Sequence, residues 1–150
     1  MKEKLVSVLD VAAYIIDKLQ QVSAVKLQKL VYYSQAWSLV WDDQSLFEEP
    51  IEAWAHGPVV PELFAVHKGQ FLVESIEGGE SSLLSTTQRE TVDGVLQYYG
   101  DKSSQWLSDL THLEDPWRNA RVGIPTGARC DTTISLESIA EYYSSIPPNA

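Results

Sequence analysis

We single out six side chains of the sequence as candidate acids, bases or nucleophiles. They are His56, His67, His112, Glu114, Asp115 and Cys130. Only His112 and Glu114 are close enough in sequence to suggest an acid–base pair. The Asp-Pro pair beside them is typical of a helix N-terminus, with Asp115 as the cap, which gives this stretch a structural explanation. We therefore predict no catalytic residue, and keep as an alternative an atypical hydrolase that uses His112 with Glu114, or Cys130.

The signatures of common enzymes and metal sites do not occur in the chain. There is no phosphate-binding glycine loop, HExxH pair, GxSxG elbow or CxxC pair. The three histidines are dispersed, and a single cysteine cannot form an internal disulfide. We expect no cofactor, no metal ion and no redox chemistry.

The net charge of the chain favours some classes of partner over others. A formal net charge of −10 repels a phosphate backbone, so direct nucleic-acid binding is not expected unless the basic residues cluster. An acidic body suits a basic protein partner, because opposite fields speed the encounter, although the same charge can serve solubility alone. No apolar run approaches the roughly 20 residues that span a bilayer, and the start does not resemble a signal peptide. We expect a cytoplasmic protein without membrane contact.

A helix from about Ser23 to Trp41 is the element around which the other groups must be placed, with Ser23 as its N-cap. At about 100° per residue, one sector of this helix is strongly apolar. The sector contains Leu27, Leu30, Val31, Ser34, Trp37 and Trp41. The opposite face is mixed, and we expect it either to meet water or to receive a partner. It contains Gln28, Tyr32, Gln35 and Leu39.

Lys26 lies at the edge of the apolar sector, within about 40° of Leu30, where a solvated lysine is not expected. We predict that it extends from the first helical turn to reach water, or that it pairs with an acid from elsewhere in the chain. The candidate acids are Glu52, Glu114 and Asp115. A structural ion pair is favoured over a functional lysine.

The rest of the chain predicts one mainly α domain over residues 1–150, compact, with about six helices and a small β-hairpin near residues 46–56. Capping residues and apolar periodicity place the helix starts. These are Ser7, Ser23, Pro61, Ser85, Ser103 or Ser104, Asp115 and Ser135. Residues 69–84 are ambiguous between one more strand and irregular structure, and we expect any mobile loop to lie there.

The hairpin is predicted because the period changes to two residues between Leu46 and His56. Pro50 is expected in its turn or on an edge, and Gly57-Pro58 is expected to break the second strand. Trp54 and His56 then stand at a rigid corner, where an amphipathic ring suits a protein interface as well as a core. Our candidate partner-binding residues are Gln28, Tyr32, Gln35, Leu39, Trp54 and His56.

Three segments of the chain are recognisable together: KLQKLVYYSQAW at 26–37, LFEEPIEAWAHGPVVPELF at 46–64 and THLEDPWRNAR at 111–121. In this order and spacing they resemble the Panacea-domain family, also called SocA-like or GepA-like, which is common in prophages and mobile elements. The resemblance covers about residues 5–145, and Val31 and Ser34 depart from the commonest motif without a chemical break. It implies that the motif residues hold a shared scaffold. These are Lys26, Leu27, Lys29, Leu30, Tyr33, Trp37, Gly57, Pro58, His112, Pro116 and Trp117.

Members of that family are known or proposed as antitoxins of toxin–antitoxin operons. Some bind the toxin directly, and one acts as an adaptor that delivers its toxin to a cytoplasmic ATP-dependent protease. The resemblance implies a mainly helical domain without enzyme activity or cofactor, whose partner is a cognate toxin and, for an adaptor, also such a protease. Specificity would then lie on less constrained surface: the 70–84 loop, the mixed helix face, and the last loop and helix. The alternative function is a prophage or mobile-element regulator that binds a host protein and has no cognate toxin.

Overall fold

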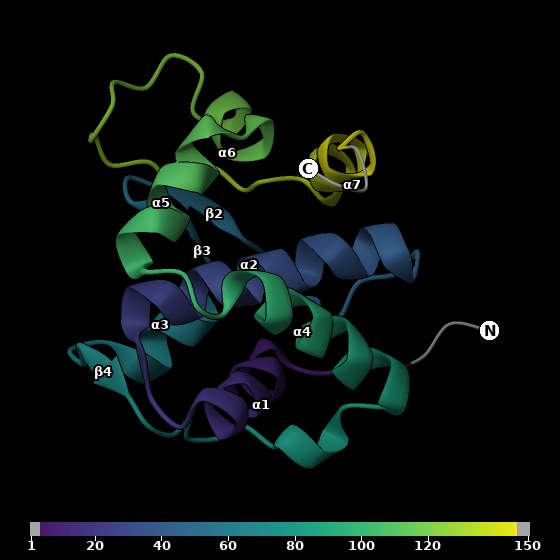
Figure 1. The fold of residues 1–150 in the computed structure, drawn as a ribbon. Coiled ribbons are helices and arrows are strands. Elements are labelled where there is room, and N and C mark those ends of the chain that lie inside the picture. Colours follow the sequence, from purple (N-terminus) through teal and green to yellow (C-terminus); the bar gives the residue numbers. More distant parts are fainter. Residues whose placement is uncertain (1–3, 147–150) are drawn as a thin grey trace.

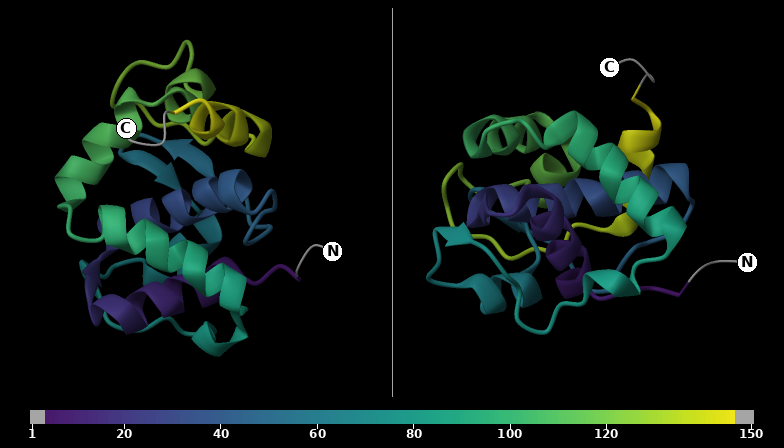
Figure 2. Two further views of the ribbon diagram at one scale, coloured as in Figure 1. Left: turned by 45° about the vertical axis from the view of Figure 1, so that its right-hand side comes forward. Right: turned by 60° about the horizontal axis from the view of Figure 1, so that its bottom comes forward.

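The second helix runs through the middle of the fold (Figure 1). In the computed structural model, which describes residues 4–146, α2 (Ala24–Trp41) packs against four other helices. They are α1 (Val8–Leu19), α4 (Thr86–Tyr99), α5 (Ser104–Leu113) and α7 (Leu136–Ser144). The views in Figure 2 show α7 lying against α2, on a different side from α1. Leu27, Leu30 and Val31 of the predicted apolar sector are fully buried.

The mixed face of α2 is also inside the protein, so our expectation that it meets water or a partner is wrong for most of it. Gln28, Tyr32 and Gln35 are buried, and Leu39 is partly buried against the core. The helical pattern could not reveal this, because neighbouring segments from both halves of the chain close over both faces of the helix. The chain itself therefore covers Tyr32 and Gln35, whereas Gln28 is buried but lies in the lining of a pocket.

Most helices begin where the capping residues predict. A serine hydroxyl accepts a hydrogen bond from the first turn at five N-caps: Ser7, Ser23, Ser85, Ser103 and Ser135. Proline starts α3 (Pro61–His67) as predicted. The exception is α6 (Asp115–Ala120), where Asp115 is already helical and no side chain makes a cap bond.

The β-hairpin lies a few residues later than predicted. Strand β2 (Glu52–Trp54) pairs antiparallel with β3 (Gly57–Val59), so the segment that we expected to break a strand forms one. Among the described residues β3 pairs with β2 and with no other strand, and Pro58 therefore needs no N–H for a second neighbour. Gly57 has a φ of +121°, which lets the chain reverse directly after His56. Pro50 lies before the hairpin and outside its turn.

The ambiguous stretch at 69–84 contains two short elements. Strand β4 (Leu72–Val73) pairs antiparallel with β1 (Val22–Ser23), just before the start of α2. The 3₁₀ helix η1 (Ser81–Leu83) packs against α1. Asp10 of α1 accepts a hydrogen bond from the backbone N–H of Glu80 at 2.8 Å, which fastens this end of the stretch.

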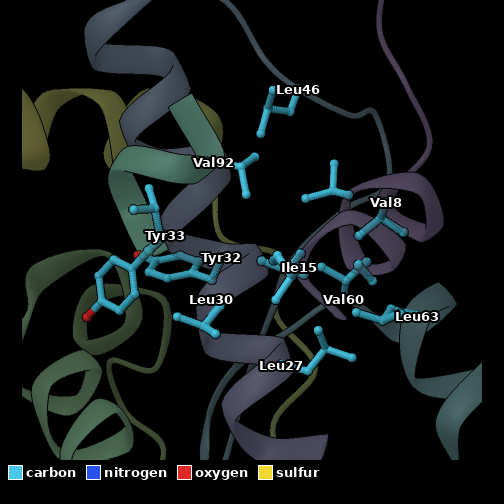
Figure 3. Close-up of a cluster of buried hydrophobic side chains, with 14 of the residues drawn as sticks. Val8, Ile15, Leu27, Leu30, Tyr32, Tyr33, Leu46, Val60, Leu63 and Val92 are labelled. Atoms are coloured by element: carbon cyan, nitrogen blue, oxygen red, sulfur yellow. The ribbon is translucent and has the colours of Figure 1, made fainter. Parts of the chain in front are cut away.

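Side chains from well-separated segments share one core. Figure 3 shows Val8 and Ile15 of α1 beside Leu27 and Leu30 of α2, with Leu63 of α3 close by. The predicted fold class, mainly α with a small β-hairpin, is confirmed, and seven α-helices lie within residues 4–146. None of the helices in this range has the length and apolar character needed to cross a membrane.

Candidate functional site

Two of the sequence motifs meet at Lys29. Its ammonium donates a hydrogen bond to the carbonyl oxygen of Pro58, with Nζ and O 3.2 Å apart. The lysine stem passes beneath Gly57, where a Cβ atom would lie 2.5 Å from Lys29 Cε. Gly57 therefore serves both the turn and the passage of the lysine.

Lys29 is a buried cation without a counter-charge. It is 1% exposed, and burial lowers its pKa to about 7. Within residues 4–146 no carboxylate lies at ion-pair distance from it. Our sequence analysis named Lys29 as a scaffold residue of the motif but did not predict its burial. The helical pattern pointed to Lys26, and only the glycine of the second motif could have indicated a side chain passing underneath.

Lys26 has a different role from the predicted ion pair. Its ammonium donates to the carbonyl oxygen of Gly100 at 2.6 Å, directly after α4. The candidate acids Glu52, Glu114 and Asp115 do not pair with it, so that prediction is wrong. Lys26 instead supplies a donor and a positive charge at the C-terminal end of α4, where both are stabilising.

The first and third motifs meet at a buried carboxylate. The hydroxyls of Tyr33 and Tyr143 donate to Glu114 Oε1 at 2.6 and 2.7 Å, and the hydroxyls of Tyr32 and Tyr143 are hydrogen-bonded at 3.0 Å. Burial raises the pKa of Glu114, while the two tyrosine donors lower it. Tyr33 also stacks on Tyr99, with ring centroids 4.2 Å apart. Glu114 thus joins α2, α7 and the start of α6.

His112 does not form an acid–base pair with Glu114. Its ring stacks on Trp117 with centroids 4.1 Å apart, and burial lowers its pKa. Nε2 of His112 is buried without a hydrogen-bond partner among residues 4–146. Trp117 Nε1 donates to the carbonyl oxygen of Trp54 at 2.8 Å, which ties the third motif to the hairpin. These contacts give His112 and Trp117 a packing role.

The other titratable candidates do not assemble into a nucleophile and base. His67 is hydrogen-bonded through Nε2 to Gln28 Nε2 at 2.9 Å, and burial lowers its pKa. Cys130 Sγ donates to Thr132 Oγ1 at 3.4 Å. No three His, Cys, Asp or Glu side chains converge on a possible metal site within the described part of the chain.

The buried glutamines of α2, which we predicted as partner-binding residues, hold the backbone of passing segments. Gln28 Oε1 accepts from the N–H of Val60 at 2.9 Å. Gln35 Oε1 accepts from the N–H of Leu46 at 2.7 Å, and its Nε2 donates to the carbonyl oxygen of Phe47 at 2.9 Å. These two side-chain amides therefore supply hydrogen bonds to backbone groups that have no partner in a β-sheet.

Trp54 and His56, the other predicted partner-binding residues, line a cavity of about 640 Å³ that we call the hairpin pocket. Its walls come from the first turns of α2, the hairpin, α3 and the loop before α7. Trp54 packs edge-on against Phe64, with ring centroids 5.0 Å apart. Lys29, His67 and Cys130 also line this pocket. The pocket therefore brings several titratable side chains together, although these three are not hydrogen-bonded to one another.

A second concave surface, which we call the aromatic groove, has a volume of about 850 Å³. It is bounded by α2, α4, α5 and α7. Its lining is mostly aromatic and aliphatic: Trp37, Val40, Trp41, Val95, Tyr98, Tyr99, Trp106, Leu110, Tyr142, Tyr143 and Ile146. Trp41, Tyr98 and Trp106 are 52%, 52% and 40% exposed, which is unusual for such large rings. Sequence reasoning missed the groove because its residues come from four separate helices.

The helices around the aromatic groove carry more acids than bases. The acids on α4, α5, α7 and the α4–α5 link are Glu90, Asp93, Asp101, Asp109, Glu137 and Glu141. The bases on these segments are Arg89 and Lys102. Lys102 lies over the Trp106 ring at 5.1 Å, so an exposed ring of the groove already contacts a cation.

Comparison with known proteins gives one family. The family model described as "Antitoxin SocA-like, Panacea domain" matches residues 27–118, which include most of α2, the hairpin and Glu114. No curated protein and no solved structure matches the chain.

Proposed function

Because the chain belongs to the SocA-like Panacea-domain antitoxin family, we propose that it neutralises a cognate protein toxin by binding it directly. The aromatic groove is the observation that supports this function best. Trp and Tyr are the residues that most often anchor protein interfaces, since they bury much area with few rotatable bonds. Three such rings exposed around one hollow make the groove a candidate interaction surface.

The charge of the surrounding helices indicates the chemistry of the toxin surface. A segment with apolar side chains would fill the groove, and Lys or Arg beside it would meet the acidic α4, α5 and α7. The rings themselves favour such a partner, because an exposed Trp face attracts a cation, as Lys102 does at Trp106. Binding either blocks the toxin's own site or presents the toxin to an ATP-dependent protease.

Growth rescue tests this function. The gene product encoded next to this chain is expressed alone and together with it, and toxicity is expected only when it is expressed alone. The double substitution Tyr98→Glu and Trp106→Glu should abolish rescue, because it places charge in the groove. Val122→Glu is the matched control, since Val122 is exposed but lies outside both the groove and the 70–84 loop, and it should still rescue growth.

The same assay distinguishes direct neutralisation from delivery to a protease and from a regulator without a toxin. Rescue that disappears in cells lacking the protease, with toxin levels that rise, would indicate delivery for proteolysis. Absence of any toxic neighbour, with capture of a host protein instead, would favour a regulator without a toxin and contradict the proposal. Rescue that is equal in the groove variant and the control would move the binding surface elsewhere.

A further inference from the structure

The lining of the hairpin pocket includes the buried lysine Lys29, whereas the lining residues of the aromatic groove include no Lys or Arg. Lys29 makes one hydrogen bond, to the carbonyl of Pro58, although an ammonium has three donors. A buried charge is costly unless an opposite charge or several acceptors meet it. Within residues 4–146 neither a carboxylate nor a second acceptor does so. Lys29, one of the lining residues, therefore has a single described acceptor and no described counter-charge.

Two further features of the pocket favour negative charge. Ala24 and Val25, the first turn of α2, form part of the wall, so the positive end of an 18-residue helix faces this region. Arg129 stands on the exposed loop that completes the pocket, and no described residue bonds to its guanidinium. The acids of the lining are Glu52, which accepts from Trp54 Nε1 at 2.8 Å, and the exposed Asp131.

The remaining wall is apolar and aromatic. Trp54 and Phe64 pack edge-on, and Val25, Ala55 and Val59 complete this side. A volume of about 640 Å³ lies within the range of pockets that take a small ligand or the end of a peptide. We propose that the hairpin pocket binds a ligand that carries one carboxylate on an apolar or aromatic body, with Lys29 as the counter-ion and Arg129 at the entrance. This site is separate from the aromatic groove and does not depend on toxin binding.

Such a carboxylate has two sources, a small organic acid or the C-terminus of a peptide. The test uses 3-indolepropionate with its neutral analogue 3-indolepropanol, and a short peptide ending in leucine as free acid or as amide. Binding is followed by amide chemical shifts and by calorimetry. We expect saturable binding of at least one free acid, with shifts at pocket residues and a preference of about tenfold or more over the neutral partner. The acid that binds identifies the source.

Two variants test the charges. Lys29→Met, which keeps the apolar stem, should abolish the preference for acid, and circular dichroism shows whether it folds. Arg129→Glu lies on the surface and should weaken acid binding without affecting the fold, while Arg89→Glu on α4 is the matched control. Equal binding of acid and neutral analogue, no saturable binding of any probe, or acid binding unchanged in Arg129→Glu would overturn the proposal. These outcomes decide the matter even if Lys29→Met does not fold.

Discussion

Tyr33 donates its hydroxyl to the carboxylate of Glu114 across 81 residues of sequence, with the two oxygens 2.6 Å apart. This bond joins the first motif to the third inside the core. A buried carboxylate needs its donors, because water cannot replace them there.

Replacing Tyr33 by Phe should destabilise the protein by about 1–3 kcal/mol, since Glu114 loses one of its two donors while ring packing is kept. Urea unfolding at pH 7 measures this change. Tyr98→Phe is the matched control, because Tyr98 is half exposed and its hydroxyl has no partner among the described residues. A control loss as large as that of Tyr33→Phe would refute the role of the bond.

Gly57→Ala should cost more stability than Gly69→Ala. Both glycines have positive φ, at +121° and +87°, so both substitutions strain the backbone. Only at Gly57 does the new Cβ also collide with another group, the Lys29 stem, whereas nothing lies within 4 Å at Gly69. We expect an excess of about 1–3 kcal/mol for Gly57→Ala, as for overpacking of a core. Equal losses of stability for the two variants in thermal or urea unfolding would show that the Lys29 side chain moves aside at no cost in free energy.

Lys29 should make stability depend on pH above neutrality. Its pKa is about 7 in the folded protein and near 10.5 when unfolded, so between these values the unfolded state binds more protons. The free energy of unfolding therefore rises as pH increases from 7, by at most about 1.4 kcal/mol per unit. Below pH 7 the penalty of the buried charge is fully present. Urea unfolding of wild type and Lys29→Met from pH 7 to 9 should give curves that diverge; parallel curves would contradict the shift.

Gln35→Leu should be strongly destabilising although it adds apolar surface to a core position. The N–H groups of Leu46 and Phe47 and the carbonyl of Phe47 would lose their partner inside the protein. We expect a loss of about 2–4 kcal/mol, from more than one unsatisfied group. Gln105→Leu removes only an exposed bond to Asp109 and should be near neutral. Hydrogen exchange should show faster exchange at Leu46 in Gln35→Leu alone.

Local features of this fold could be predicted from the sequence, because the groups that determine them are neighbours in the chain. Ser7, Ser85 and Ser135 cap their helices, and Pro61 starts α3, since each acts within one turn. Burial of Gln28 and Gln35 could not be predicted, because it depends on which distant backbone needs a donor or acceptor. The side-chain pattern alone makes such a glutamine look like surface.

For the candidate sites too, features that depend on distant segments of the chain were not predicted. Trp54 and His56, predicted at a rigid corner, line a pocket in the structure, and binding by them stays a prediction. Lys29 was named as a scaffold residue of the motif, but its burial was not predicted because it arises when the hairpin closes over α2. The aromatic groove was missed because Trp41, Tyr98 and Trp106 lie on three helices whose packing no local pattern specifies.

Arg121 and α7 lie in the C-terminal part of the chain and connect it to the hairpin and the core. Its guanidinium donates to the carbonyls of Ala53, Pro125 and Ala128 at 2.9, 3.2 and 2.7 Å, and α7 then brings Tyr143 to Glu114. During synthesis the ribosome releases α2 and the hairpin well before these groups. Until residue 143 has emerged, Glu114 lacks the donor that Tyr143 supplies. The buried carboxylate is therefore fully satisfied only when α7 packs against α2.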